Sequence, residues 1–175
     1  MNLEQYRQEA TFLKTASHGD NLVADYGSDW FWLKCVVKDA RWLQMKARLV
    51  EFLLLIDSAA CQGTIDAIVM PPWLTKRLGR EPTQKEADEF DKLFFETPFQ
   101  KRFQLIRPWG LWSPSGFIYW FTPEMRQFLI RQFVGGPDCE IRIAVAGLPV
   151  ALDAFEFLVA AAAEVPVENV LVEAP

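Results

Sequence analysis

The sequence has little of the equipment on which most enzymes depend. Its 175 residues include a single histidine, His18, and three cysteines, Cys35, Cys61 and Cys139. An odd number of widely separated cysteines argues against a disulfide scaffold and indicates buried thiols in a reducing compartment. A nucleophile activated by histidine would have to use His18, which precedes Gly19 at the end of an expected helix and belongs to no catalytic motif.

Motifs for metals and nucleotides are missing as well. The chain has no C-x-x-C or H-x-x-x-H pair, no G-x-x-x-x-G-K-[ST] loop and no G-x-G-x-x-G fingerprint. Zinc sites need clustered cysteine and histidine ligands, and phosphate-binding loops need glycines where the backbone approaches the phosphate. We therefore expect no enzyme activity, no catalytic residue, no metal site and no cofactor.

Uninterrupted apolar runs of membrane-spanning length are also lacking. The run at 49–56 is too short to cross a bilayer. The longer stretch at 143–163 contains Asp153 and Glu156, and carboxylates at the centre of a membrane are costly. Residues 1–7 have no apolar segment of the secretory type, so we expect a cytoplasmic protein that does not bind membranes.

Apolar and aromatic residues, by contrast, are abundant. Hydrophobic residues make up 51% of the sequence and aromatic residues 14%. A chain of this length can bury about 70% of the surface that its unfolded form exposes. We expect a single globular domain over residues 1–175, which can be subdivided into a helix-rich aromatic part, 1–136, and an acidic part, 137–175.

Hydrophobic periodicity predicts helices over residues 2–17 and 40–60. A third helix is expected from Thr83 to about Glu96, because Thr83 and Glu86 have the spacing of a capping box. The apolar run at 30–37 fits either a strand or the first turns of the next helix. The sequence therefore leaves open whether the tryptophans of this run, Trp30 and Trp32, lie in the core or at the surface.

Further along, the aromatic run at 117–121 is typical of a short strand. The triplet Thr122, Pro123 and Glu124 has the features of a helix start, so a helix is expected from there to Gly135. These expectations depend on local signals alone.

The last part of the chain has the pattern of a β-α-β unit. It consists of a strand at 141–146, an alanine-rich helix at 152–164 and a second strand at 167–172. A crossover of this length allows the two strands to pair in parallel. The fold class expected for the whole chain is α+β, rich in helix, with this C-terminal β-α-β unit and a small sheet.

Aromatic residues are concentrated between Phe90 and Phe133, where thirteen of the twenty-four occur. Most of them are expected to pack in the core. Trp109 and Trp112 differ, because they stand in a Gly- and Pro-containing loop that should run over the surface. There they fit either core packing or the anchors of a protein–protein interface.

Negative charge is concentrated at the other end of the chain. Residues 137–175 carry seven acids and one base, and the whole chain has a net charge of −5. The acids chosen as candidates for binding a basic partner are Asp138, Glu140, Asp153 and Glu156. Such a patch repels nucleic acid and anionic membranes, and residues 76–107, with eight bases and six acids, are not basic enough for a nucleic-acid interface.

The stretch 115–124, which reads Ser-Gly-Phe-Ile-Tyr-Trp-Phe-Thr-Pro-Glu, resembles a segment of small bacterial immunity proteins of toxin–immunity pairs. The resemblance extends over about residues 115–134. It implies a cytoplasmic protein that binds a cognate toxin and occludes its active site, without catalytic residues of its own.

The leading hypothesis is therefore an immunity protein that neutralises a basic toxin domain by stoichiometric binding, with Trp109 and Trp112 as anchors. The alternative is a protein or enzyme that binds a sugar or nucleotide through the aromatic segment 109–121. In that case Asp57, Glu86 or Glu89 would be the acid or base. A third hypothesis is an adaptor subunit of a larger assembly.

Overall fold

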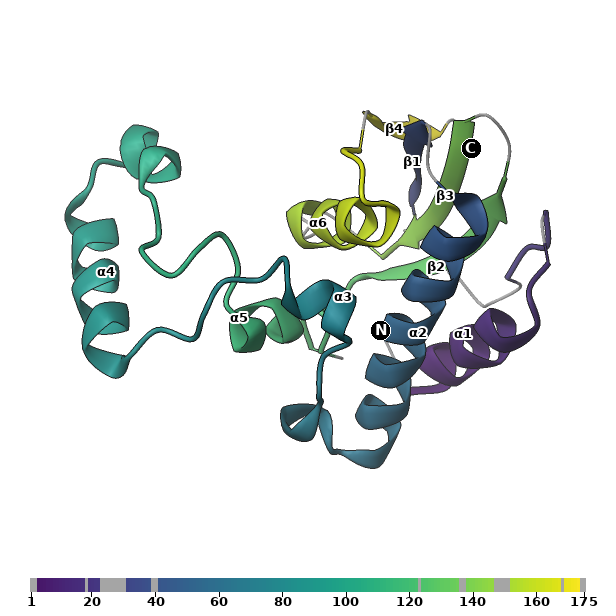
Figure 1. The fold of residues 1–175 in the computed structure, drawn as a ribbon, viewed down its shortest axis with the longest axis horizontal. Coiled ribbons are helices and arrows are strands. Elements are labelled where there is room, and N and C mark those ends of the chain that lie inside the picture. Colours follow the sequence, from purple (N-terminus) through teal and green to yellow (C-terminus); the bar gives the residue numbers. More distant parts are fainter. Residues whose placement is uncertain are drawn as a thin grey trace.

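A four-stranded antiparallel sheet is the framework of the protein, which has an α+β fold (Figure 1). This computed structural model describes residues 3–17, 19–22, 31–38, 41–122, 124–135, 138–146, 152–167 and 169–173. The strands are β1 (Phe31–Lys38), β2 (Phe128–Val134), β3 (Asp138–Val145) and β4 (Asn169–Glu173), in the order β2-β3-β1-β4. His18 and Trp30 lie outside the described residues.

The predicted C-terminal β-α-β unit is present as β3, α6 (Leu152–Ala163) and β4. Both strands are antiparallel to β1, so they run parallel to each other. They do not pair with each other, however, because β1 lies between them. The predicted direction is confirmed and the predicted pairing is wrong, since the crossover through α6 spans the width of an additional strand.

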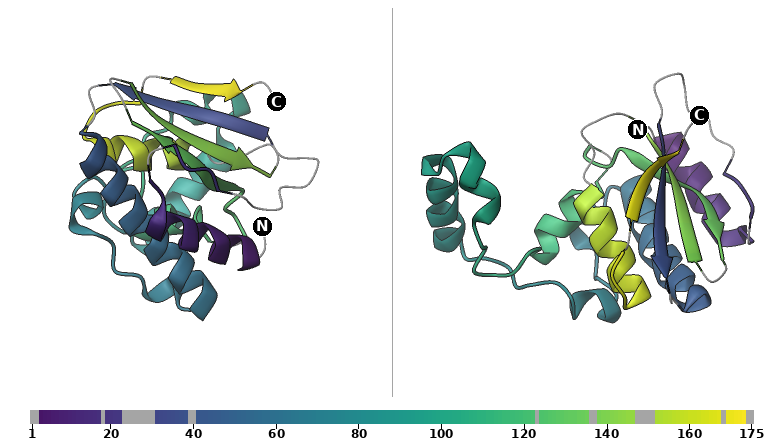
Figure 2. Two further views of the ribbon diagram at one scale, coloured as in Figure 1. Left: turned by 90° about the vertical axis from the view of Figure 1, so that its right-hand side faces the viewer. Right: turned by 90° about the horizontal axis from the view of Figure 1, so that it is seen from above.

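One face of the sheet is buried under helices, as Figure 2 shows. Alternate residues of β3, such as Ile141 and Ile143, point to this face and belong to the core, whereas Glu140 and Arg142 lie on the opposite face. On that outer face Trp32 is half-buried, with the guanidinium of Arg131 at 4.4 Å from the centre of its ring.

The helical layer consists of α1 (Leu3–Thr15), α2 (Trp42–Gln62) and α6, with α2 packed against both others. All three helices were predicted. The buried residues of α2 include Met45, Leu49, Phe52, Leu53 and Ile56. This helix ends at Gly63, whose φ of 67° suits glycine and whose N–H donates to the last carbonyls of the helix. Among the described residues, no helix is long and apolar enough to cross a membrane.

Two predictions between residues 114 and 135 are wrong. The run at 117–121 belongs mostly to a short helix, α5 (Pro114–Tyr119), whose N-cap Ser113 accepts a hydrogen bond from the N–H of Gly116. The hydroxyl of Thr122 donates to the carbonyl of Tyr119, so Thr122 closes this helix and does not begin another.

The expected helix over residues 122–135 is replaced by strand β2. The register of β2 against β3 shifts between Ile130 and Gln132, which is a β-bulge. Because of this bulge, Phe128, Ile130 and Phe133 all face the core. Their spacing departs from the strict alternation of a strand, which explains why the sequence resembled a helix here.

The remaining elements connect α2 to α5. They are η1 (Ile65–Ala67), α3 (Pro72–Thr75), α4 (Gln84–Glu96) and η2 (Phe99–Gln104). Of these, α4 and η2 extend away from the rest of the molecule (Figures 1 and 2).

Candidate functional site

Residues 80–107, which contain α4 and η2, form a projection that we call the arm (Figure 1). None of the residues of α4 is buried, although the helix is amphipathic. Its apolar side includes Phe90 and Phe94, whose rings stack with centroids 6.4 Å apart. The helix ends at Glu96 because Thr97 has extended backbone angles, as is usual for a residue that precedes proline.

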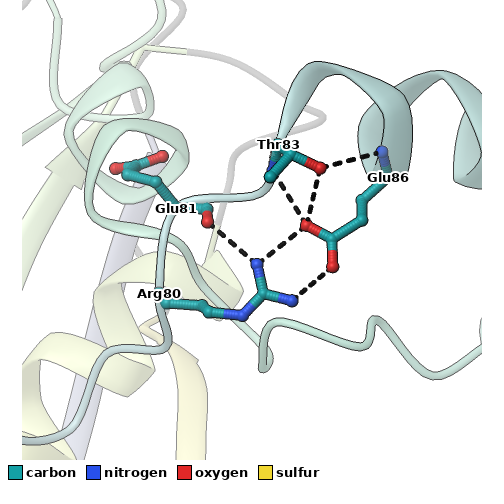
Figure 3. A network of polar contacts seen from close by, with 4 residues as sticks. All are labelled: Arg80, Glu81, Thr83 and Glu86. Atoms are coloured by element: carbon teal, nitrogen blue, oxygen red, sulfur yellow. Dashed lines mark hydrogen bonds and ion pairs between the residues drawn. The ribbon is translucent and has the colours of Figure 1, made fainter.

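The predicted capping box at the start of α4 is confirmed (Figure 3). The hydroxyl of Thr83 accepts from the N–H of Glu86, and the Glu86 carboxylate accepts from the N–H of Thr83 at 2.8 Å. Arg80 donates to both oxygens of Glu86, and these bonds, with those from Thr83, lower the pKa of Glu86 to about 2. The carboxylate of Glu81 points the other way and accepts from the N–H and hydroxyl of Ser115, at 2.6 and 2.7 Å.

The two chain segments at the base of the arm are held together directly. The N–H of Gly79 donates to the carbonyl of Trp112 at 2.8 Å, and the N–H of Arg80 donates to that of Trp109 at 3.1 Å. A Cβ atom on Gly79 would lie 1.8 Å from the carbonyl oxygen of Trp109. Only glycine allows this approach. Backbone contacts therefore set the direction in which the arm leaves the rest of the molecule, which we call the body.

Two hollows follow the arm and the segment after it, and both extend to Asp153 at the start of α6. A hollow of about 710 Å³ is lined by the apolar side of the arm, including Phe94, and by Asp153 at the start of α6. A second hollow of about 580 Å³ lies between residues 107–120 and α6. Both are lined by Arg107, Leu111 and Asp153, so they are parts of one groove, which we call the arm groove.

Four of the six predicted binding residues gather at or beside this groove. Trp112, Asp153 and Glu156 line the second hollow, and Trp109 lines a smaller adjoining one together with Trp112. Trp109 is half-buried, with its ring edge-on to Phe90 at 5.3 Å. The two tryptophans thus pack against neighbouring rings and also form part of the groove wall.

The indole of Trp112 packs edge-on against Phe117, with centroids 5.9 Å apart. Its N–H is buried and has no hydrogen-bond partner among the described residues. Buried indole N–H groups usually have a partner, so this one is an unsatisfied donor within the groove wall.

Asp153 and Glu156 lie three residues apart in the first turns of α6, Asp153 exposed and Glu156 half-buried. In the described part of the chain, neither carboxylate forms an ion pair. Burial raises the pKa of Glu156, and the charge of Asp153 raises it further. A cationic side chain placed beside both carboxylates would relieve this repulsion.

The other two predicted residues are elsewhere. Asp138 is exposed at the start of β3, and Glu140 lies on the outer face of the sheet. Burial opposes ionisation of Glu140, but hydrogen bonds from Lys34 and Arg142 outweigh it and lower its pKa. The charge of Glu140 is therefore satisfied within the chain, and the predicted acidic patch is divided between two faces.

Sequence reasoning missed Arg107 and Phe157, which also line the second hollow, whereas Leu111 and Trp120 belong to the segment 109–121 of the small-ligand hypothesis. A signal for Phe157 was present, because it stands four residues after Asp153 and shares its face of the helix. Arg107 carried no such signal, because its position depends on how the arm leaves the body.

A cluster of charged residues is completely buried below the sheet. Arg126 donates to the carbonyl of Phe128 at 3.0 Å and to Asp57 at 2.6 Å, and it also pairs with Glu9. The other oxygen of Glu9 accepts from the N–H of Ile130 at 2.5 Å. The cluster joins α1 and α2 to the start of β2, and it had no signature in the sequence.

This cluster places two carboxyl groups around one guanidinium. Burial raises the pKa of Glu9, Arg126 lowers it and the charge of Asp57 raises it, and together these effects give a pKa of about 8. Burial likewise raises the pKa of Asp57. One oxygen of Asp57 and the hydroxyl of Tyr6 are buried without a hydrogen-bond partner in the described part of the protein. The cluster therefore holds a proton on one of its carboxyl groups at neutral pH.

The three acid or base candidates of the small-ligand hypothesis are all engaged away from the arm groove. Asp57 is in the buried cluster, and Glu86 belongs to the capping box. Glu89 is exposed on α4, where its carboxylate lies 3.7 Å from the ammonium of Lys85. In the residues that the structure describes, no cluster of three or more histidine, cysteine or acidic side chains could hold a metal ion.

No family model, curated protein or solved structure matches this chain. The arm and its groove are therefore the features from which a function is proposed.

Proposed function

We propose that this chain is a protein-binding protein that holds a segment of its partner in the arm groove. The observation that carries the proposal is the gathering of Trp112, Asp153 and Glu156 in a groove beside an arm whose helix buries none of its residues. Apolar walls with a few unsatisfied polar groups are typical of protein interfaces.

The apolar and the acidic side chains of the second hollow have different tasks. Leu111, Trp112 and Phe157 form an apolar wall that receives an aliphatic or aromatic side chain. Asp153 and Glu156, beside that wall, receive a lysine or arginine of the same segment. Acidic groups of this kind also speed the encounter with a basic partner, and this effect weakens as salt is added.

The most concrete form of the proposal is a cytoplasmic immunity protein that neutralises a bacterial toxin. The resemblance over residues 115–134 supports it, because Trp120 of that segment lines the groove and Ser115 binds Glu81 at the base of the arm. In this form the basic substrate cleft of the toxin faces Asp153 and Glu156. Binding occludes that cleft at one inhibitor per toxin.

Site-specific photo-crosslinking tests the proposal. A photoreactive residue replaces Leu111, which is 65% exposed in the groove, and in a control it replaces Leu43, which is 78% exposed on α2. A heterologous protein should be crosslinked from position 111 and not from 43, and the double substitution Asp153→Lys, Glu156→Lys should abolish the crosslink. Equal crosslinking from both positions, or none that depends on the two acids, would contradict the proposal.

The purified partner then separates the two protein-binding hypotheses. If the partner is a toxin, its activity should fall to zero at an equimolar amount of this chain. Binding without inhibition would instead indicate the adaptor subunit.

The size of the hollows favours one second candidate, a small-ligand site, because volumes of roughly 300–1,000 Å³ are usual for such sites. A saturable change in tryptophan fluorescence on addition of a nucleotide or oligosaccharide, lost in Trp112→Phe, would support it. A flat response across both ligand classes would count against it.

A further inference from the structure

The tip of the arm has the chemistry that the arm groove is suited to bind. Residues 99–107 contain Lys101, Arg102 and Arg107 and no acid. Phe99 and Ile106 in the same stretch are 77% and 88% exposed. The tip is therefore a cationic and apolar segment, presented at the surface.

Among the described residues, no base of the tip forms an ion pair with an acid of the groove. Arg107 lines the groove beside Asp153, but its guanidinium donates to the carbonyl of Leu111 at 3.0 Å and lies over the ring of Phe90. Arg102 donates to two carbonyls of the arm and stacks on Phe94, with its guanidinium 4.8 Å from the ring centre. Lys101 is exposed, and its ammonium forms no ion pair with any described residue. Lys101 and the two acids are thus complementary charges of one chain that form no ion pair among the described residues.

Exposed apolar surface is also concentrated on and beside the arm. Of the eight large apolar side chains that are exposed in the described part of the protein, five lie between residues 93 and 111. They are Leu93, Phe95, Phe99, Ile106 and Leu111. An isolated helix of 13 residues is marginal in water and usually depends on packing of its apolar face.

We propose that two copies of this chain exchange arms, so that the tip of each arm lies against the second hollow of the other copy, which contains Asp153 and Glu156. Lys101 of one copy then contacts Asp153 and Glu156 of its partner, and Ile106 covers the apolar wall beside them, while Phe99 continues to line the first hollow of its own chain. Two-fold symmetry makes both contacts identical, and two-fold dimers are the commonest homo-oligomers. The projecting arm in Figure 1 has the shape that such an exchange requires.

A charge-swap experiment on the full chain tests the exchange. One variant carries Lys101→Glu, and the other carries Asp153→Lys with Glu156→Lys. Each variant alone brings like charges together in its dimer, so its self-association should weaken at least about ten-fold. In an equimolar mixture both contacts are complementary again, so a heterodimer should form. Mass is measured by light scattering and sedimentation at low and high salt.

The control is Lys85→Glu, which makes the same charge change at a position on α4 that is 83% exposed and outside the groove. It should dimerise like the unaltered chain. Far-ultraviolet circular dichroism checks that all variants keep their helix content. The proposal is overturned if the unaltered chain stays monomeric at 100 μM and low salt, or if the mixture does not restore association.

The exchange uses the same groove as the proposed function, but the two can fail separately. If the chain is monomeric and Leu111 is still crosslinked to another protein, the exchange is wrong and the proposed function stands. If dimers form and obey the charge swap while no other protein is crosslinked, the exchange stands and the proposed function is wrong. If both are right, partner and second copy compete, and Lys101→Glu should increase partner binding.

Discussion

A carboxyl group that cannot reach water changes how stability depends on pH, and Glu9 is such a group. Its pKa is about 8 in the folded protein, against an ordinary value of 4.5. Between these two values the folded chain binds more protons than the unfolded chain, so the free energy of unfolding falls as pH rises. We expect stability to be greatest near pH 5 and to decrease by a few kcal/mol towards pH 8.

Urea unfolding at pH 5, 6.5 and 8 measures this decrease. Glu9→Gln should remove most of it, because glutamine keeps an oxygen for the N–H of Ile130 and does not titrate. Glu4→Gln, on the exposed side of the same helix, is the control and should leave the pH dependence unchanged. Stability that is flat or rising over this range would show that the cluster holds no extra proton.

Gly79 supports a second prediction at the scale of one residue. A methyl group there collides with the carbonyl of Trp109, so Gly79→Ala must separate the two segments at the base of the arm. We expect a loss of about 1–3 kcal/mol, as for other overpacked sites. Gly63→Ala is the matched control, because Gly63 has a positive φ but nothing within 4 Å of an added Cβ, and its cost should stay near 1 kcal/mol. Thermal unfolding gives both values.

At the scale of elements, the helices with strong local signals were predicted well. The periodicity of α2, the cap at Gly63 and the capping box of α4 each depend on a few neighbouring residues. Strand β2 (Phe128–Val134) was not predicted, because its formation depends on pairing with β3 and on the bulge after Ile130. Such long-range effects override local propensity.

The candidate site, too, could be predicted from the sequence only in part. Its aromatic and acidic members on the loop and on α6 could be named from composition and position. Their meeting in one groove could not, because it depends on the backbone contact between Gly79 and Trp112. The ion pairs of Glu140 and the buried cluster around Arg126 were equally invisible, since their partners are far apart in the sequence.

The capping box allows a prediction for α4 as an element. Thr83→Ala removes the hydroxyl that accepts from the N–H of Glu86, which typically costs about 1 kcal/mol. Because α4 buries no residue, this loss should open the arm and leave the body intact. We expect amide hydrogen exchange about five-fold faster in α4 and unchanged in α2. Unchanged exchange in α4, or faster exchange in both helices, would contradict this.

For the molecule as a whole, the arm should be the first place where a protease cuts. Exposed segments with few buried contacts open most easily. Limited trypsin digestion should therefore cleave first after Lys101 or Arg102, while the fully buried Arg126 stays intact. Mass spectrometry of the first fragments identifies the site. Early cleavage after Arg126 would mean that the body, and not the arm, is the less stable part.

The position of β1 between β3 and β4 has a consequence for the order in which the protein folds. Trp32 pairs with Glu173, and Val36 pairs with Asn169, so this side of the sheet cannot close until the C-terminal strand has been synthesised. Until then one edge of β1 presents unpaired backbone groups to other chains. Folding is expected to be slow, and a nascent chain halted before β4 should be prone to aggregate.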